Sequence, residues 1–260
     1  MQRKRIHVNV SDFPDIFRPL LAGYPVFDSS CSPNARVYYI AGDGGYYLKC
    51  SHKGSLEKEA KLTRFFHEHG LAAEVLTYES LDKDYLLTAA IPGEDCIHPM
   101  YLDDPVRLCD TTAQLLRTLH DTPADGCPVC RTEDYIKTAE RNYRNKAYDM
   151  TLFPDNWGYS SPEAAWEVIQ KYAGCLKSDT LLHGDYCLPN ILLDNWQFRG
   201  FVDMDTGGIG DRHIDLFWGV WSLQFNLKTG RYRERFLDAY GRKDVEEEMF
   251  RVIAAFEVFE

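Results

Sequence analysis

The sequence has 260 residues, of which 45% are apolar and 27% are charged, and its formal net charge is −11. This balance is ordinary for a water-soluble globular protein, and no apolar run reaches the roughly 20 residues that cross a bilayer. The acidic excess disfavours nucleic acid and anionic membrane surfaces as partners; it either favours a cationic small molecule or serves only solubility. We therefore expect a cytoplasmic protein, monomeric or dimeric, without a nucleic-acid or membrane partner.

Eight cysteines are spread along the chain. Cys127 and Cys130 have the C-x-x-C spacing of metal and redox sites. A zinc site needs four ligands, however, and neither a second C-x-x-C nor an H-x-x-x-H follows. A redox motif would require a surrounding βαβ unit, which the pattern lacks. We expect reduced thiols with structural roles.

The first third of the chain is predicted to be mostly strand. Residues 35–40 and 46–50 flank a Gly-Asp-Gly-Gly turn, which indicates a β-hairpin. Ser55 is a suitable N-cap for a helix with apolar residues at helical spacing, and Gly70 is a suitable end for it. Two further strands are expected at 75–78 and 85–88. This order predicts a small sheet with one helix packed on it.

The pattern becomes helical after the segment 89–95, which contains Pro and Gly. Apolar residues recur at helical spacing from Pro105. Ser161 followed by Pro162 is a strong helix start, because proline suits the first helical position and serine suits the cap. Further helices are expected at 133–149, 211–225, 231–240 and 245–260.

These elements predict an α+β fold with two lobes. The expected division is a β-rich lobe at 1–88, a connector at 89–95, and a helical lobe at 96–260. A cleft between two such lobes is the usual position for a ligand site.

The most informative segment begins with a His-Gly-Asp triplet that ends at Asp185, and Asn190 follows five residues later. Two short apolar runs then lead to Asp203. If these runs form a hairpin that turns at 196–197, Asn190 faces Asp203 with about 5 Å between their Cα atoms. An amide oxygen and a carboxylate held side by side are suited to Mg²⁺.

Asp185 would lie one short loop away from that metal site. A carboxylate there can orient a hydroxyl nucleophile and accept its proton, and phosphoryl transfer requires little else beyond positioning and charge neutralisation. The spacing H-x-D-x-x-x-x-N, followed by an apolar hairpin and a second Asp, is also that of the protein-kinase catalytic loop. The alternative is that these three residues cap ordinary turns.

The strings HGDYCLPNILLD, GFVDMD and GDRHIDL resemble the signature of the aminoglycoside phosphotransferases, and within them the 3′-phosphotransferases. The similarity is strongest over residues 180–223, and weaker similarity covers most of the chain. The motif is specific for kinase-like small-molecule phosphotransferases and less specific for the acceptor.

The resemblance implies a protein-kinase-like fold that uses ATP or GTP together with Mg²⁺. It assigns Asp185 as the catalytic aspartate and assigns Asn190 and Asp203 as the metal ligands. Lys49 matches the strand lysine that contacts the nucleotide phosphates, and Glu59 matches its ion-pair partner.

The resemblance also implies less specific nucleotide contacts. Thr88 and Ala90 fall where the family's inter-lobe connector presents its backbone to the adenine. The family's serine-containing phosphate loop matches residues 28–35, where Ser32 either hydrogen-bonds phosphate or belongs to a plain turn. Asp215 matches a residue that braces the catalytic loop through backbone hydrogen bonds.

A small cationic acceptor would require carboxylates in its pocket. Asp155 and Glu257 lie in segments where the family places acidic residues, and Glu260 adds a further carboxylate beside the chain end. Where the family often has D-L-G-R, this chain has D-M-D-T, so that Asp205 is an additional acid that could bind an ammonium group or mark a different substrate. Each of these residues could equally be a solvated surface charge.

We therefore expect transfer of the γ-phosphoryl group to a hydroxyl of an aminoglycoside. Two alternatives stay open. The acceptor could be a macrolide, a peptide antibiotic, choline or an amino sugar, or the chain could be a nucleotide-binding pseudokinase. A protein kinase is disfavoured, because no A-P-E segment or long activation loop follows Asp203.

Overall fold

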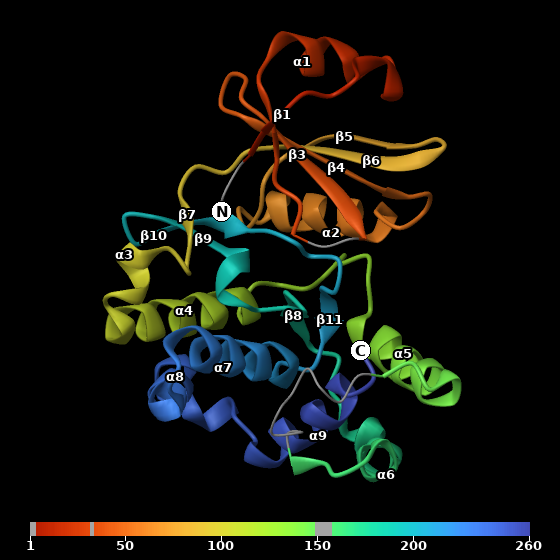
Figure 1. The fold of residues 1–260 in the computed structure, drawn as a ribbon. Helices are drawn as coiled ribbons and strands as arrows, with labels where there is room; N and C mark the ends of the chain where they lie inside the picture. The colour runs from red at the N-terminus through yellow and green to blue at the C-terminus, as the bar shows by residue number, and fades with distance from the viewer. Residues whose placement is uncertain (1–3, 32–33, 149–157) are drawn as a thin grey trace. The chain divides into compact units, whose positions relative to one another are not determined.

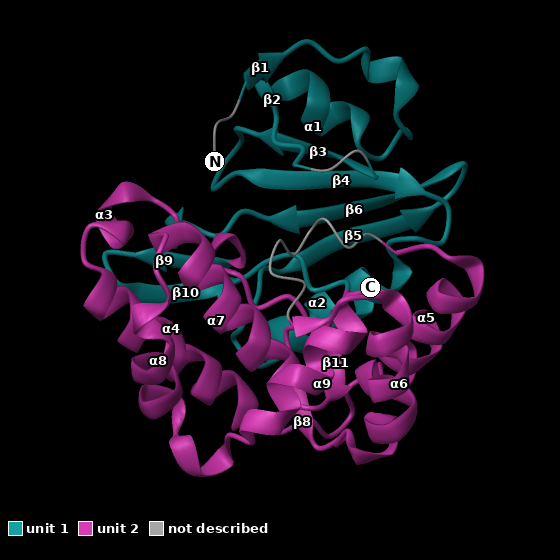
Figure 2. Ribbon diagram, turned by 60° about the horizontal axis from the view of Figure 1, so that its bottom comes forward, with its two compact units in different colours: residues 1–95, 191–205 teal, residues 96–190, 206–260 magenta. Residues whose placement is uncertain are grey.

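The computed structural model describes residues 4–31, 34–148 and 158–260. The chain forms two compact units (Figure 2): Met1–Asp95 with Ile191–Asp205, and Cys96–Asn190 with Thr206–Glu260. We call them unit 1 and unit 2. No helix in the described ranges has the length and apolarity required to cross a membrane.

Unit 1 is built on an antiparallel sheet of six strands with the order β1-β2-β3-β4-β6-β5, and most elements of both units are labelled in Figure 1. A second sheet has the order β10-β9-β7. In chain order, the strands and helices of unit 1 are β1 (Lys4–Ile6), α1 (Arg18–Gly23), β2 (Val26–Asp28), β3 (Ala35–Ile40), β4 (Tyr46–His52), α2 (Glu57–Glu68), β5 (Val75–Ser80), β6 (Lys83–Ala89), β7 (Glu94–Asp95), β9 (Ile191–Asp194) and β10 (Gln197–Phe201).

Alternating side chains place different groups on the two faces of the six-stranded sheet. On one face, Leu48 and Cys50 of β4 pack in a core with Phe17 from just before α1. On the other face, Leu86 of β6 packs against α2 through Ala60. The predicted hairpin of β3 and β4, the helix and the two later strands are confirmed.

The predicted N-cap of α2 is wrong. The Ser55 hydroxyl donates instead to the carbonyl of His52 at 2.6 Å, and Leu56 occupies the cap position without a side-chain bond of its own. The predicted end is confirmed, because Gly70 follows the helix with a φ of 71°, which favours glycine.

The hairpin of β9 and β10 belongs to unit 1, although the expected division assigned it to the helical lobe. β9 pairs with β7, and the backbone N–H of Phe201 in β10 donates to the carbonyl of Leu71 at 2.7 Å. These contacts join the hairpin to the connector and to the segment after α2.

Unit 2 is mainly helical, as predicted, with a two-stranded sheet of β8 and β11. In chain order, its elements are α3 (Pro99–Leu102), α4 (Pro105–His120), α5 (Arg131–Asn145), α6 (Pro162–Tyr172), β8 (Thr180–Leu182), the 3₁₀ turn η5 (Leu188–Asn190), β11 (Gly208–Gly210), α7 (His213–Leu227), α8 (Arg233–Tyr240) and α9 (Glu247–Glu257). The predicted cap of α6 is confirmed, because the Ser161 side chain accepts from the N–H of Ala164.

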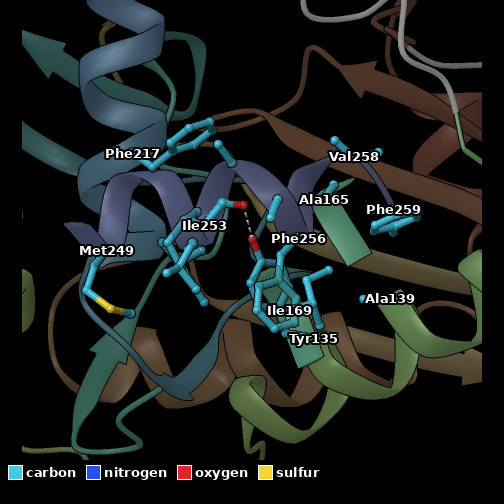
Figure 3. Close-up of a cluster of buried hydrophobic side chains, with 14 of the residues drawn as sticks. Tyr135, Ala139, Ala165, Ile169, Phe217, Met249, Ile253, Phe256, Val258 and Phe259 are labelled. Atoms are coloured by element: carbon cyan, nitrogen blue, oxygen red, sulfur yellow. Dashed lines mark hydrogen bonds between the residues drawn. The ribbon is translucent and has the colours of Figure 1, made fainter. Parts of the chain in front are cut away.

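The main core of unit 2 gathers around α9. Ile253 and Phe256 of that helix are fully buried, and Tyr135 and Ala139 of α5 pack with them (Figure 3). The rings of Tyr135 and Phe256 are stacked with 4.6 Å between centroids. This core fixes α5 against the helix that ends the described chain.

Candidate active site

The loop that contains Asp185 is held by a buried carboxylate of α7. Asp215 is fully buried and accepts from the backbone N–H of His183 at 2.8 Å and from that of Gly184 at 2.7 Å. These two peptide N–H groups therefore have an acceptor inside the unit, and the two hydrogen bonds fix the backbone of the loop. The bracing role expected of Asp215 is confirmed.

Gly184 itself is required by this loop. Its φ is 88°, and a Cβ atom there would lie 2.0 Å from the carbonyl oxygen of Thr206. No other residue fits this position without moving the chain. The close contact of the two backbones fixes the direction in which the chain enters Asp185.

Asn190 orients the carboxylate of Asp185. Its amide nitrogen donates to Asp185 Oδ2 at 2.9 Å and to the Asp185 carbonyl at 3.0 Å. Asn190 ends the turn η5, and its own N–H donates to the carbonyl of Cys187. The five-residue spacing seen in the sequence therefore closes a compact loop in which the amide oxygen of Asn190 is left for another ligand.

The hairpin that leads to Asp203 is confirmed, but its predicted register is wrong. Asp194 pairs with Gln197, so that the turn consists of Asn195 and Trp196, both with positive φ. A bulge between Phe198 and Gly200 then moves the pairing by one residue, and Phe201 faces Ile191. The direct pairing of Asn190 with Asp203 does not follow from this register.

Lys49, Glu59 and Asp203 form one charged cluster in unit 1. Lys49 Nζ lies 2.9 Å from Glu59 Oε1 and 3.1 Å from Asp203 Oδ1. The ion pair predicted for Lys49 and Glu59 is confirmed. The contact with Asp203 was missed, because it joins residues 154 positions apart.

The local pattern explains how Lys49 reaches this cluster. It alternates with Leu48 and Cys50 on β4, so that its side chain leaves the sheet on the face of α2 rather than on that of α1. Burial alone would lower the pKa of Lys49, but the charges of Glu59 and Asp203 outweigh it and raise that pKa. The lysine therefore stays positively charged, and its side chain is 19% exposed.

Asp205 also belongs to unit 1. Its charge contributes to the raised pKa of Lys49, although less than Glu59 and Asp203 do. The role expected of Asp205, as a ligand for an acceptor ammonium group or as the mark of a different substrate, stays a prediction.

A row of aromatic side chains, not expected from the sequence, lies on the Lys49 face of the sheet. Tyr39 and Tyr47 are cross-strand partners with 5.2 Å between ring centroids, and Tyr47 in turn pairs with Thr88. The N–H of Ala90 donates to the carbonyl of Gly45 at 2.9 Å. That amide is consequently engaged by the sheet, and the expected adenine contact of Ala90 could use only its carbonyl.

The acidic residues near the chain end have different environments. Glu257 is buried and accepts from the Tyr135 hydroxyl at 2.5 Å. Its burial, reinforced by the nearby charge of Glu260, raises its pKa to about 8. Glu260 Oε1 lies 2.5 Å from a guanidinium nitrogen of the buried Arg131. Ser32 and Asp155 lie outside the described residues.

The cysteines and possible metal clusters add nothing to this site. All eight cysteines of the chain are free. In the part of the chain that the structure describes, no three His, Cys, Asp or Glu side chains are grouped so that they could hold a metal ion.

Comparisons with known proteins agree with this geometry. A profile of the phosphotransferase enzyme family matches residues 32–253. A protein of Lactococcus lactis subsp. lactis (strain IL1403) named probable aminoglycoside 3′-phosphotransferase is 42% identical over 258 residues, which are 98% of each chain.

Solved structures have the same fold. A type VIII aminoglycoside-3′-phosphotransferase has a TM-score of 0.76 at 24% identity, covering 97% of this chain and 100% of that one. An aminoglycoside phosphotransferase from Streptomyces rimosus, in complex with ADP and streptomycin, has a TM-score of 0.69 at 21% identity and covers 85% of this chain and 90% of that one.

Proposed function

The chain belongs to the phosphotransferase enzyme family, and we propose that it transfers the γ-phosphoryl group of ATP to the 3′-hydroxyl of an aminoglycoside. The observation that carries this proposal is the 42% identity, end to end, with the probable aminoglycoside 3′-phosphotransferase of Lactococcus lactis. The ADP bound by the Streptomyces rimosus relative supports ATP as the donor.

Unit 1 binds the nucleotide in this proposal. Lys49 is a half-buried cation that Glu59 holds in place, which suits it to contact the phosphates of ATP. The row formed by Tyr39 and Tyr47 offers an aromatic surface on the same face of the sheet, on which a purine base can stack. Thr88 lies at the end of this row.

Asn190 and Asp203 would hold a magnesium ion. Asn190 uses its amide nitrogen to bind Asp185, so that its oxygen is available, and the Asp203 side chain is 55% exposed. Both offer the oxygen donors that magnesium prefers. When bound, the ion would supply positive charge that neutralises the phosphates of the nucleotide.

Asp185 orients the acceptor hydroxyl and takes its proton. A bond forms between the acceptor oxygen and the γ-phosphorus, the bond to the ADP oxygen breaks, and the hydroxyl proton passes to the Asp185 carboxylate. The hydrogen bond from Asn190 and the backbone bonds to Asp215 keep this carboxylate in one orientation. Such preorganisation is the main contribution that a protein can make to this reaction.

The acceptor is a polycation, which the net charge of −11 favours. Glu260 is an acidic group of unit 2 that could bind an ammonium group, although Arg131 already pairs with it. Glu257 accepts a hydrogen bond from Tyr135 and lies in the core, so that it supports this region from within. Asp155 stays a further candidate from the sequence.

The test is to incubate the protein with ATP, Mg²⁺ and an aminoglycoside that bears a 3′-hydroxyl, and to look for a mass gain of one phosphate. The matched control acceptor is the 3′-deoxy form of the same drug, which should gain none. The matched control enzyme is Asp185→Asn, which should bind ATP but leave the drug unmodified. Equal modification of both acceptors would contradict the 3′ assignment, and modification of neither would contradict the acceptor class.

A further inference from the structure

Helix α2 is anchored at its start by a carboxylate from the sheet. The first N–H groups of a helix have no partner within the helix, and α2 has no side-chain cap of its own. The N–H of Leu56 donates instead to Asp84 Oδ2 at 2.8 Å. Asp84 lies on β6, 28 residues further along the chain.

Asp84 is built into the fold for this contact. Its side chain is fully buried, and the same oxygen accepts from the Tyr78 hydroxyl at 3.0 Å. Burial alone would raise the pKa of Asp84, but the hydrogen bonds that it accepts hold that pKa below its ordinary value. A charged carboxylate at this place also complements the positive end of the helix dipole.

The anchored turn is the one that carries the partner of Lys49. Glu59 follows Leu56 by three residues, so that both belong to the first turn of α2. Leu86 is two residues from Asp84 on β6 and packs with Leu56, which places both β6 side chains on the face of α2. Leu86 also pairs in register with Lys49. One strand therefore supports the helix turn and the lysine together.

We propose that Asp84 is a positioning residue for nucleotide binding: by holding the N–H of Leu56, it fixes the first turn of α2 so that Glu59 keeps Lys49 directed toward the phosphates. This inference rests on the proposed role of Lys49 in binding ATP. It assigns a function to a carboxylate that is fully buried against the start of α2.

A double-mutant cycle between Asp84 and Glu59 tests the proposal. The dissociation constant of ATP is measured by calorimetry for the wild type, for the single variants Asp84→Asn, Asp84→Ala and Glu59→Gln, and for each Asp84 change combined with Glu59→Gln. If Asp84 acts through Glu59, Asp84→Ala weakens ATP binding about tenfold in the wild type, and less than about twofold once Glu59 is replaced. Asp84→Asn keeps an acceptor oxygen and should lose less than Asp84→Ala.

Two controls separate positioning from general damage. Asp82→Asn changes an exposed carboxylate two residues away and should leave ATP binding unchanged. Hydrogen exchange should become faster in residues 56–62 of Asp84→Asn while the helices of unit 2 keep their protection. If Asp84→Ala does not fold, the cycle is completed with Asp84→Asn.

The outcomes are distinct. Equal losses in both backgrounds would mean that Asp84 supports the fold without acting through Glu59, and would overturn the inference. Weaker ATP binding by Glu59→Gln but not by either Asp84 variant would also overturn it, and would leave the proposed function standing. A coupled effect on ATP binding in a protein that phosphorylates no aminoglycoside would support the inference and refute the proposed acceptor.

Discussion

Replacing Glu257 with Gln should make the protein more stable at alkaline pH. In the folded chain, the pKa of this buried glutamate is raised to about 8 from its ordinary value of 4.5. Between these values the folded state holds a proton that the unfolded chain has lost, so that the free energy of unfolding falls as the pH rises. Below pH 4.5 both states are protonated and the penalty disappears.

The size of the penalty follows from the same two values. At about 1.4 kcal/mol for each pH unit, the full difference is at most about 5 kcal/mol above pH 8. Gln is neutral at every pH and can still accept the hydrogen bond from Tyr135 through its amide oxygen. We expect Glu257→Gln and the wild type to have similar stability at pH 5, and the variant to gain at least about 1 kcal/mol at pH 9.

Urea unfolding, followed by tryptophan fluorescence at pH 5, 7 and 9, measures this difference. Glu167→Gln is a matched control, because Glu167 is exposed on α6 and its replacement should not change the pH dependence. Glu260→Gln removes a charge that raises the pKa of Glu257, and should make the stability of the protein less sensitive to pH. Parallel curves for the wild type and Glu257→Gln would refute this account of the buried carboxyl group.

The proposed chemistry makes three further predictions. Asp185→Asn should lower kcat by about 10²-fold to 10⁴-fold, because the proton acceptor is lost. The dissociation constant of ATP should stay close to that of the wild type, and substantial turnover would refute the role of Asp185. Asp203→Ala should remove the Mg²⁺ dependence of ATP binding, as measured by calorimetry, and an unchanged magnesium titration would argue against Asp203 as a ligand. The KM of a polycationic acceptor should rise with ionic strength, because salt screens its attraction to an acidic protein; a constant KM would indicate an acceptor without charge.

Features set by neighbouring residues could be predicted from the sequence. The alternation of Leu48, Lys49 and Cys50 implies a strand with the lysine on its own face, and a following helix supplies Glu59 within ten residues. The cap of α6 by Ser161 is equally local. In each case the two interacting residues are at most ten positions apart in the sequence. Their spacing alone therefore restricts where the two side chains can lie relative to each other.

The register of the β9–β10 hairpin could not be predicted in the same way. Its turn places Trp196 at a φ of 68°, a conformation that bulky residues rarely adopt, and a bulge follows at Phe198 and Gly200. Neither irregularity leaves a clear sequence signal. A shift of one residue is enough to change which side chains face each other across two strands.

Contacts between residues that lie far apart in the sequence could not be predicted either. The hydroxyl that binds Glu257 comes from Tyr135, 122 residues earlier, and the core around α9 explains why this acid is buried. The carboxylate that caps α2 comes from Asp84 after an intervening strand, which is why the local signal of Ser55 was misleading. Only the packed structure reveals these partners.

Side chains along β4 alternate strictly between the two faces of the sheet, and this alternation restricts where the chain can gain or lose residues. Adding or deleting one residue within the strand would replace Lys49 by Leu48 or Cys50 on the face toward α2. The cation would be lost from that face, and an apolar side chain would take its place. A change of length between Ile40 and Tyr46 could instead be absorbed by the glycine-rich turn. Homologous chains should therefore differ in length at that turn and keep the spacing from Tyr46 to Lys49 constant.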